Sequence, residues 1–242
     1  MKRTTTILFA LLLAAGVMAQ DDEMGGLGIH VGYASPTLRI NSPSSKKLEN
    51  IAMNGVKIGL SYDASIVKGF GSTLGLNYTF ATYHSNWTYI SEMSTDQARY
   101  RGNYHGLEIF CDWQYKFQIA GNTYLMLYTG PSIQVHLSLK EYEYIRTAEG
   151  VFPVDADAPG AYYGYTHRDN HDGEDFKRVN VTWGIGAGFQ YKRYFIRGGY
   201  DFGLFNPYKK DTFKAMGIDS ELYTRGRFDQ WQIKIGMYIW QN

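Results

Sequence analysis

Residues 179–204 read VNVTWGIGAGFQYKRYFIRGGYDFGL and alternate between apolar and polar side chains, with one pause at Lys192 and Arg193. Successive side chains of a β-strand point to opposite faces, so the alternation predicts a hairpin with one apolar face and one glycine-rich polar face. A strand of about ten to twelve residues, tilted by about 40°, spans roughly 25 Å, the height of the apolar band of an outer-membrane barrel. The hairpin therefore predicts two membrane-spanning strands.

The same alternation recurs along the rest of the chain. It predicts eight strands, whose connections alternate between long and short. In an outer-membrane barrel the short turns lie at one end with both termini, and the long loops lie at the other end. The strands are expected at 27–35, 54–63, 73–82, 105–117, 124–140, 178–191, 194–204 and 229–240. The long connections are 36–53, 83–104, 141–177 and 205–228, and the short ones are 64–72, 118–123 and 192–193.

The apolar face of these strands carries no charged side chain, although charged residues make up 19% of the chain. A charge at the midplane of a bilayer costs about 2–4 kcal/mol, so a lipid-facing surface explains the exclusion. Aromatic side chains gather toward the ends of this face, as interfacial girdles require. The girdle residues are Tyr62, Trp113, Tyr115, Tyr191, Tyr194 and Trp231. On the fifth strand the apolar face comprises Leu125, Leu127, Thr129, Pro131, Ile133, Val135, Leu137 and Leu139.

The opposite face is rich in glycine and poor in charge, which distinguishes this chain from a soluble lipocalin-like barrel of the same strand number. The outer surface of a soluble barrel would be rich in Lys and Glu. Glycine weakens a strand unless another group approaches closely, as it does inside a narrow barrel. The chain therefore predicts an all-β fold, an eight-stranded antiparallel transmembrane β-barrel of the outer-membrane type. Its interior is expected to hold Phe110, Tyr128, Phe195, Tyr238 and Trp240.

Charged side chains on the polar face are expected to form one structural network in the lumen. Eight strands enclose an interior just wide enough for side chains, and unpaired charges there would be costly. Asp201 and Lys234 lie at similar heights on neighbouring strands, so they are the preferred pair. A filled lumen also predicts that the barrel does not conduct appreciably. The expected network comprises Lys57, Glu108, Asp112, Lys116, Arg197, Asp201 and Lys234, with His30 and His136 between them.

Residues 1–19 match an export signal with cleavage after Ala19, which leaves residues 20–242 as one barrel domain. The signal has Lys2 and Arg3 before an apolar run that is far too short to span a bilayer as a helix. Loss of these two cations takes the formal net charge from +1 to −1, so the charge does not favour nucleic acid as a partner. Cys111 is the one cysteine in the sequence, which excludes an internal disulfide. The expected location is the cell outer membrane, with its lipids as partners.

Four stretches resemble the PorT-like outer-membrane β-barrel family of Bacteroidetes. They are GVKIGLSYDASIVKGFGSTLGLNYTF (55–80), YHGLEIFCDWQYKF (104–117), YLMLYTGPSI (124–133) and VTWGIGAGFQYKRYFIRGGYDFGLFN (181–206). Two departures are Phe110 where the family often has proline, and a final aromatic, Trp240, two residues before the end. The resemblance implies an outer-membrane barrel, with envelope or secretion proteins as partners. It does not imply one activity, because the family mixes secretion-associated members with others of unknown role.

A histidine and a serine two residues apart, His136 and Ser138, resemble the catalytic pair of outer-membrane lipid A deacylases. Glu141, just beyond, matches the acid that orients such a histidine as general base for the serine. Both residues fall on the predicted lumen face, which an acyl chain does not easily reach. No catalytic residue is therefore assigned, and the protein is expected not to be an enzyme.

The third long loop contains a cluster of histidines and carboxylates. Its histidines could bind a transition metal if the loop formed a helical turn, and its carboxylates could bind calcium. The spacing of a calcium loop is absent, so a solvated acidic loop is preferred, and neither a metal nor a cofactor is expected. The cluster comprises His167, Asp169, His171, Asp172, Glu174 and Asp175.

The long loops are also rich in aromatic side chains, which offer large contact area at low ordering cost and suit surface recognition. Packing of the same side chains into a cap on the barrel rim is an equal alternative. We expect a structural or binding protein that acts through its outer loops or a partner complex. The alternatives are a narrow channel and an outer-membrane lipid-modifying enzyme. The loop aromatics are Trp87, Tyr89, Tyr142, Tyr144, Tyr162, Tyr163 and Tyr165.

Overall fold

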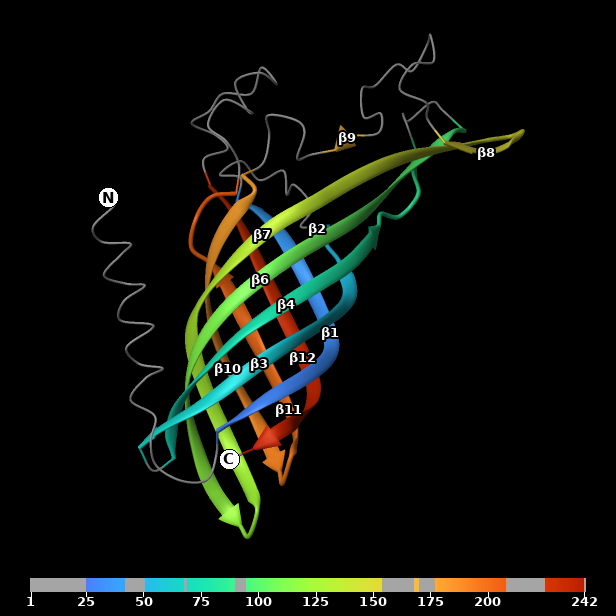
Figure 1. Ribbon diagram of the computed structural model, residues 1–242. Coiled ribbons are helices and arrows are strands. Elements are labelled where there is room, and N and C mark those ends of the chain that lie inside the picture. The colour runs from blue at the N-terminus through green and yellow to red at the C-terminus, as the bar shows by residue number, and fades with distance from the viewer. Residues whose placement is uncertain are drawn as a thin grey trace.

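The computed structural model shows an all-β chain in which eight long antiparallel strands form a ring (Figure 1). Each strand pairs with the next along the chain, and the last pairs with the first. This confirms the predicted fold class. The structure describes residues 25–41, 51–67, 69–89, 95–153, 168–169, 177–207 and 225–241. The ring comprises β1 (Gly26–Asn41), β3 (Asn54–Val67), β4 (Phe70–His84), β6 (Gln97–Ala120), β7 (Thr123–Thr147), β10 (Val179–Tyr191), β11 (Tyr194–Gly203) and β12 (Arg225–Gln241).

Four short strands lie outside the ring: β2 (Ile51–Ala52), β5 (Thr88–Tyr89), β8 (Gly150–Pro153) and β9 (Arg168–Asp169). They pair with β1, β6 and β7 near the long-loop end. In the part of the chain that is described, no helix is long and apolar enough to cross a membrane.

Tight turns join the strands at the opposite end, which we call the short-turn end. Gly69 and Gly121 adopt positive φ values of 80° and 47° in two of these turns, and Lys192 has φ 52° in the third. A left-handed residue lets two antiparallel strands reverse within a few residues. The first turn is shorter than the predicted 64–72, because β3 continues to Val67 and β4 begins at Phe70.

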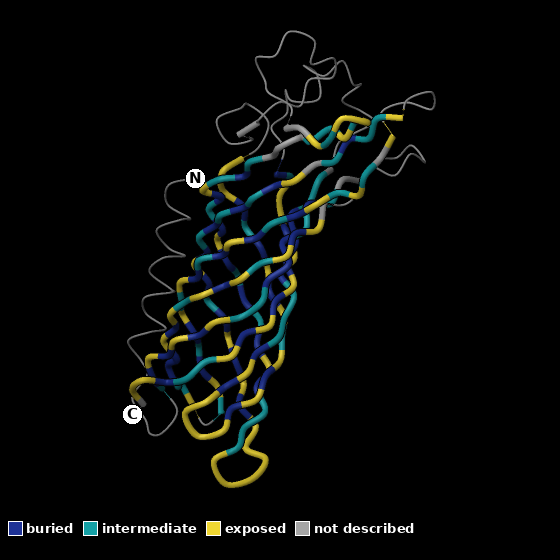
Figure 2. The backbone as a smooth tube through the Cα atoms, turned by 90° about the vertical axis from the view of Figure 1, so that its right-hand side faces the viewer, coloured by how far each residue is buried: buried dark blue, intermediate teal, exposed yellow. Residues whose placement is uncertain are grey.

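Exposed and buried residues alternate along each strand of the barrel wall (Figure 2). Ile58 and Leu60 are 51% and 52% exposed, whereas Lys57, which directly precedes Ile58, is fully buried. The wall is therefore apolar outside and polar inside, the reverse of a soluble protein. All six predicted girdle aromatics are exposed on the outer face: Tyr62, Trp113, Tyr115, Tyr191, Tyr194 and Trp231.

Strands β6 and β7 rise far above their neighbours at the long-loop end (Figure 1). Strand β4 ends opposite Arg101 of β6, and β10 begins opposite Val135 of β7. Beyond these points the two strands pair with each other as far as Gln97 and Arg146. The predicted strands, 105–117 and 124–140, stop short of this extension because its polarity no longer follows the pattern of the membrane band.

Two bulges place three residues on the face opposite to the one predicted: Ser138 and Leu139 on β7, and Trp240 on β12. The pairing of His105 with Ser138 and of Gly106 with His136 leaves Leu137 as an extra residue on β7. A one-residue insertion reverses the faces of all that follows. Leu139 is consequently 7% exposed and packs inward, whereas Leu137 is 47% exposed.

The second bulge lies near the end of β12. Leu27 pairs with Trp240 and Gly28 with Tyr238, so Ile239 is the extra residue. Trp240 is therefore 54% exposed at the short-turn rim and does not lie in the lumen. The other four interior aromatics, Phe110, Tyr128, Phe195 and Tyr238, are buried as predicted.

The bulge on β7 predicts opposite responses at two neighbouring leucines. Leu139→Ala should lower the free energy of unfolding by about 2–5 kcal/mol, because it removes a side chain from a packed apolar cluster. Leu137→Ala should cost less than about 1 kcal/mol, because the side chain is exposed. Urea unfolding of both variants in the same lipid vesicles measures the difference. A larger loss for Leu137→Ala would show that the strand has no bulge there.

Candidate functional site

A buried carboxylate on β3, Asp63, is the centre of a charge cluster in the part of the lumen nearest the short-turn end, which we call the lower lumen. Its carboxylate oxygens lie 3.0 Å from the guanidinium of Arg197 on β11 and 3.0 Å from the ammonium of Lys116 on β6. The hydroxyl of Tyr238 on β12 also donates to Asp63. These partners come from opposite sides of the ring, so the cluster bridges the lumen.

Neutral side chains add further hydrogen bonds to this cluster, although Nε of Arg197 is buried without a partner. Thr73 donates to Asp63 at 2.8 Å, and the amide of Gln114 donates at 3.0 Å. The guanidinium of Arg197 also donates to the amide oxygen of Gln114 at 3.0 Å. A buried ion pair is stabilising only where additional hydrogen bonds satisfy its remaining atoms. Here the lumen supplies such bonds from β4, β6 and β12.

Glu108 on β6 is the centre of a second cluster higher in the lumen. Its carboxylate lies 3.0 Å from the ammonium of Lys57 on β3 and accepts from the amide of Asn77 at 2.6 Å. Amides of Gln134 on β7 and Gln230 on β12 donate to it at 3.2 and 3.3 Å. This cluster also bridges the lumen, because β12 and β6 lie on opposite sides of the ring.

Asp201 joins the second cluster through glutamine amides. Gln232 donates to Asp201 at 2.8 Å and accepts from Lys57 at 2.8 Å. The predicted pair of Asp201 and Lys234 does not form, and the strand register explains why. Asp201 lies opposite Gln230, whereas Lys234 lies opposite Arg197. The ammonium of Lys234 instead lies 4.4 Å from the ring centroid of Phe110, a cation–π contact.

The structure thus places all seven predicted network residues in the interior. Asp112 is buried on the same face of β6 as Glu108 and Lys116. Among the described residues the lumen holds four cations and four carboxylates. The cations are Lys57, Lys116, Arg197 and Lys234, and the carboxylates are Asp63, Glu108, Asp112 and Asp201.

Sequence reasoning missed Asp63, although two signals identify it. It continues the inward row of β3 two residues beyond Ser61, at the point where the predicted strand stopped. The predicted network also had one more cation than carboxylate, an imbalance that a narrow, dry lumen does not tolerate. Asp63 removes that imbalance.

Aromatic side chains fill the space that the glycines leave. A Cβ atom at Gly75 would lie 2.3 Å from the ring of Phe110, and one at Gly186 would lie 2.2 Å from the ring of Tyr128. Such contacts are too close for any side chain, so these glycines are required for the aromatic rings to enter the lumen. Aromatic rings therefore occupy part of the interior, in addition to the charge pairs.

His136 and Ser138 do not form a pair on one face. His136 is buried, and its Nδ1 lies 3.1 Å from the hydroxyl of Tyr104, whereas Ser138 follows the bulge and lies on the outer face opposite His105. The side chain of Glu141 lies outside what the structure describes. Among the described residues, His136 and Ser138 therefore lie on opposite faces of β7 and do not form the pair that such an enzyme would need.

The predicted metal cluster of the third long loop lies almost entirely outside the described residues, which include only the backbone of Arg168 and Asp169. Within the described ranges, no group of three or more His, Cys, Asp or Glu side chains is arranged to hold a metal ion.

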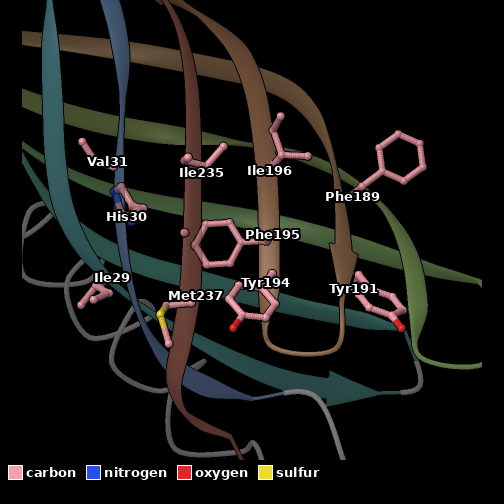
Figure 3. A pocket seen from close by; sticks show the side chains of 11 residues that line it. Ile29, His30, Val31, Phe189, Tyr191, Tyr194, Phe195, Ile196, Ile235 and Met237 are labelled. Carbon is pink, nitrogen blue, oxygen red and sulfur yellow. The ribbon is translucent and has the colours of Figure 1, made fainter.

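A cavity of about 650 Å³ lies on the outer wall near the short-turn end (Figure 3). Two rows of apolar side chains from β1, β12, β11 and β10 line it, with the rings of His30 and Phe195 behind them. These rows belong to the lipid-facing surface. The cavity is therefore a groove on the apolar outer face of the barrel. The rows comprise Val31, Ile235, Ile196 and Phe189, and Ile29, Met237, Tyr194 and Tyr191.

At the long-loop end an indole ring contacts two guanidinium groups. The guanidinium carbon of Arg146 is 4.3 Å from the ring centroid of Trp87, and that of Arg99 is 4.7 Å from it. Arg99 also lies 5.8 Å from the ring of Tyr144. Cation–π contacts of this kind hold β5 and the tip of the β6–β7 hairpin together. Tyr89 remains 66% exposed. The side chains of Tyr142, Tyr162, Tyr163 and Tyr165 lie outside the described residues.

Comparison with known proteins identifies a family of membrane barrels. A family model described as outer membrane protein beta-barrel domain matches residues 18–208. Among curated proteins, none matches this chain.

Several solved barrels are similar in fold. The attachment invasion locus protein Ail of Yersinia pestis has 13% identity, with 89% of this chain and 99% of that chain covered and a TM-score of 0.37. Neisserial surface protein A has 11% identity, 90% and 100% coverage and a TM-score of 0.40. The N-terminal barrel domain of Pseudomonas aeruginosa OprF has 12% identity, 88% and 99% coverage and a TM-score of 0.29. Likeness at this level carries no functional argument.

The Asp63 cluster predicts a large and specific loss of stability on neutralisation. Asp63→Asn should lower the free energy of unfolding by about 3–5 kcal/mol, because it leaves Arg197 and Lys116 buried without a counter-charge. Asp201→Asn is the matched control and should cost about 1 kcal/mol, because the partners of Asp201 are neutral amides. Urea unfolding in one detergent gives both values. Equal losses would show that Asp63 is not the centre of the network.

Proposed function

The chain belongs to the outer membrane protein β-barrel domain family, and from this premise we propose that it is a closed outer-membrane barrel that acts by binding at its long-loop end. The barrel anchors the protein in the membrane and holds the β6–β7 hairpin in place. It does not pass solutes. The proposed partners are proteins of the envelope, and the long loops are proposed to face outward.

The observation that carries this proposal is the pair of charge clusters that cross the lumen. Asp63 joins β3 to β11 and β6, and Glu108 joins β6 to β3 and β12. An ion that crossed the lumen would have to break these pairs at two heights in succession. Separating a buried pair costs several kcal/mol, so the clusters oppose conduction as well as unfolding.

The shape of the long-loop end supports a binding role. The paired extension of β6 and β7 stands above the ring, and rigid strands present a site with more accuracy than loops do. Near its tip Tyr89 and Val151 are exposed, 66% and 48%, beside the stacked Trp87. Exposed aromatic side chains beside arginine are enriched at protein interfaces.

A finer assignment to the PorT-like family is part of the proposal. It is supported by the four stretches between residues 55 and 206 and by their order along the chain. With that assignment, the envelope partners would include proteins of a secretion system.

The closed lumen predicts that the barrel does not conduct ions. The purified protein in a planar bilayer should give no steady conductance above the baseline, because both clusters block the lumen. The double variant Asp63→Ala with Arg197→Ala removes one carboxylate and one cation from the Asp63 cluster, so the net charge of the lumen is unchanged although Lys116 remains. It is the control for incorporation and should conduct more than the wild type, because one of the two barriers is weakened. A steady wild-type current would refute the closed lumen.

The proposed binding surface predicts that cross-linking depends on position. A photo-activated amino acid at Tyr89 should capture an envelope protein in living cells, because this position is exposed beside the hairpin tip. The matched control is Ile119, which is 58% exposed at the short-turn end. Protein adducts from Ile119 alone would place the binding surface at the wrong end of the barrel. Cleavage of intact cells by trypsin within 140–177, with the 192–193 turn spared, would independently report the orientation.

A further inference from the structure

The outer face of the β6–β7 extension carries two arginines as close neighbours. Arg99 lies opposite Tyr144, and Arg146 lies opposite Gln97, so the two arginines are diagonal neighbours on one face of the hairpin. Diagonal neighbours of an antiparallel pair are roughly 7–8 Å apart. Arg99 continues the row of odd-numbered residues on β6 to which the exposed Ile109 belongs, so this face points away from the interior of the barrel.

A single indole ring contacts both guanidinium groups. The centroid of the Trp87 ring is 4.7 Å from the guanidinium carbon of Arg99 and 4.3 Å from that of Arg146. Attraction to the ring offsets part of the repulsion between the two cations and restricts where they lie. A planar guanidinium over a ring keeps N–H donors along its edges, in the fork geometry that matches a carboxylate.

Neither guanidinium group has a carboxylate partner among the described residues. Asp96 and Glu149, the described carboxylates nearest to them in sequence, form no ion pair with either arginine. Nε of Arg99 is buried and has no hydrogen-bond acceptor. In the lower lumen, by contrast, the guanidinium of Arg197 lies 3.0 Å from the carboxylate of Asp63. Because a buried donor without an acceptor is unfavourable, an acceptor that bound at Arg99 would stabilise this part of the hairpin.

Apolar side chains lie on both sides of the arginine pair. Here β5 pairs with β6, β6 with β7, and β7 with β8. Tyr89 of β5 lies opposite Gln97, and Val151 of β8 lies opposite Arg146. Because Gln97 and Arg146 are themselves opposite each other, all four residues share one cross-strand row, and its two ends, Tyr89 and Val151, are 66% and 48% exposed. A ligand that fills this surface needs an anionic group at its centre and apolar groups on either side.

We propose that Trp87, Arg99 and Arg146, which we call the arginine–tryptophan site, bind a carboxylate in an acidic segment of a partner protein. Tyr89 and Val151 then contact apolar side chains on either side of that carboxylate. This inference rests on the proposed function and names the chemistry that the long-loop end recognises. Guanidinium and carboxylate form two parallel hydrogen bonds, and apolar neighbours exclude water from such pairs at the centre of an interface. A phosphate or a sugar would gain the contacts with the arginines but would leave the apolar side chains exposed.

The test selects ligands from a display library of random peptides, with the full barrel in lipid nanodiscs as bait. Peptides that bind the wild type should be enriched in aspartate or glutamate next to apolar or aromatic residues. Fluorescence anisotropy of a selected, dye-labelled peptide then measures its affinity for variants. Arg99→Gln and Arg146→Gln should each weaken binding about tenfold, because each removes a charge-assisted pair. Arg146→Lys should weaken it about fivefold, because an ammonium keeps the charge but cannot form the two parallel hydrogen bonds.

The matched control is Arg101→Gln. Arg101 is exposed two residues along the same face of β6, so its substitution removes the same charge from the same hairpin. It should weaken binding less than about threefold, because an exposed charge outside the contact is screened. Equal losses for Arg101→Gln and Arg146→Gln would show charge attraction without a site and would overturn the proposal. Selected peptides without acidic residues would overturn it as well.

Other occupants give different outcomes. Displacement of the peptide by millimolar inorganic phosphate, or by vesicles of diphosphoryl lipid A, would show a site for phosphate and would overturn a protein partner. Binding that begins only after deletion of residues 170–176 would show that an acidic segment of this chain is the occupant, with the same consequence. Capture of an envelope protein from Tyr89 together with a failed selection would overturn this inference alone. A successful selection without such capture would overturn the proposed function alone.

Discussion

The contact of Asp63 with Arg197 and Lys116 is the interaction on which the interior of this barrel depends. A narrow lumen excludes the water that would otherwise solvate four cations, so each needs a carboxylate, an amide or an aromatic ring within reach. Asp63 serves two of them at 3.0 Å. Its partners come from strands that are not neighbours in the ring, so the contact fixes the two sides of the wall relative to each other.

The outer wall follows from the same separation of environments. Because charges are gathered inside, the outer face is free to present only apolar side chains and aromatic girdles to lipid. The groove near the short-turn end is part of this surface. Above the membrane band the sides exchange roles, and the interior becomes apolar around Tyr104 and Phe228.

The strands and most inward-facing residues could be predicted from the sequence, because successive side chains of a strand alternate between only two faces. Lys57, Glu108 and Arg197 were placed inside by that rule alone. The predictions that failed depended on how the strands are aligned with one another. Leu139 and Trp240 follow bulges, which insert one residue and carry no local signature, and the pairing of Asp201 depends on an offset of four residues between β11 and β12. Asp63 was missed because the strand end was placed too early, not because its chemistry is ambiguous.

The β6–β7 hairpin has two parts with different structural roles: one part belongs to the barrel wall, and the other extends beyond it. Within the wall, adding or deleting a residue would displace Glu108 or Gln134 from the lumen. Beyond Arg101, where β4 has ended, β6 and β7 pair mainly with each other, so this outer part of the hairpin could gain or lose residues in matched pairs without disturbing the barrel. The hairpin is therefore a place where the reach of the protein beyond the membrane could change in evolution, or be altered by grafting, while the anchor stays the same.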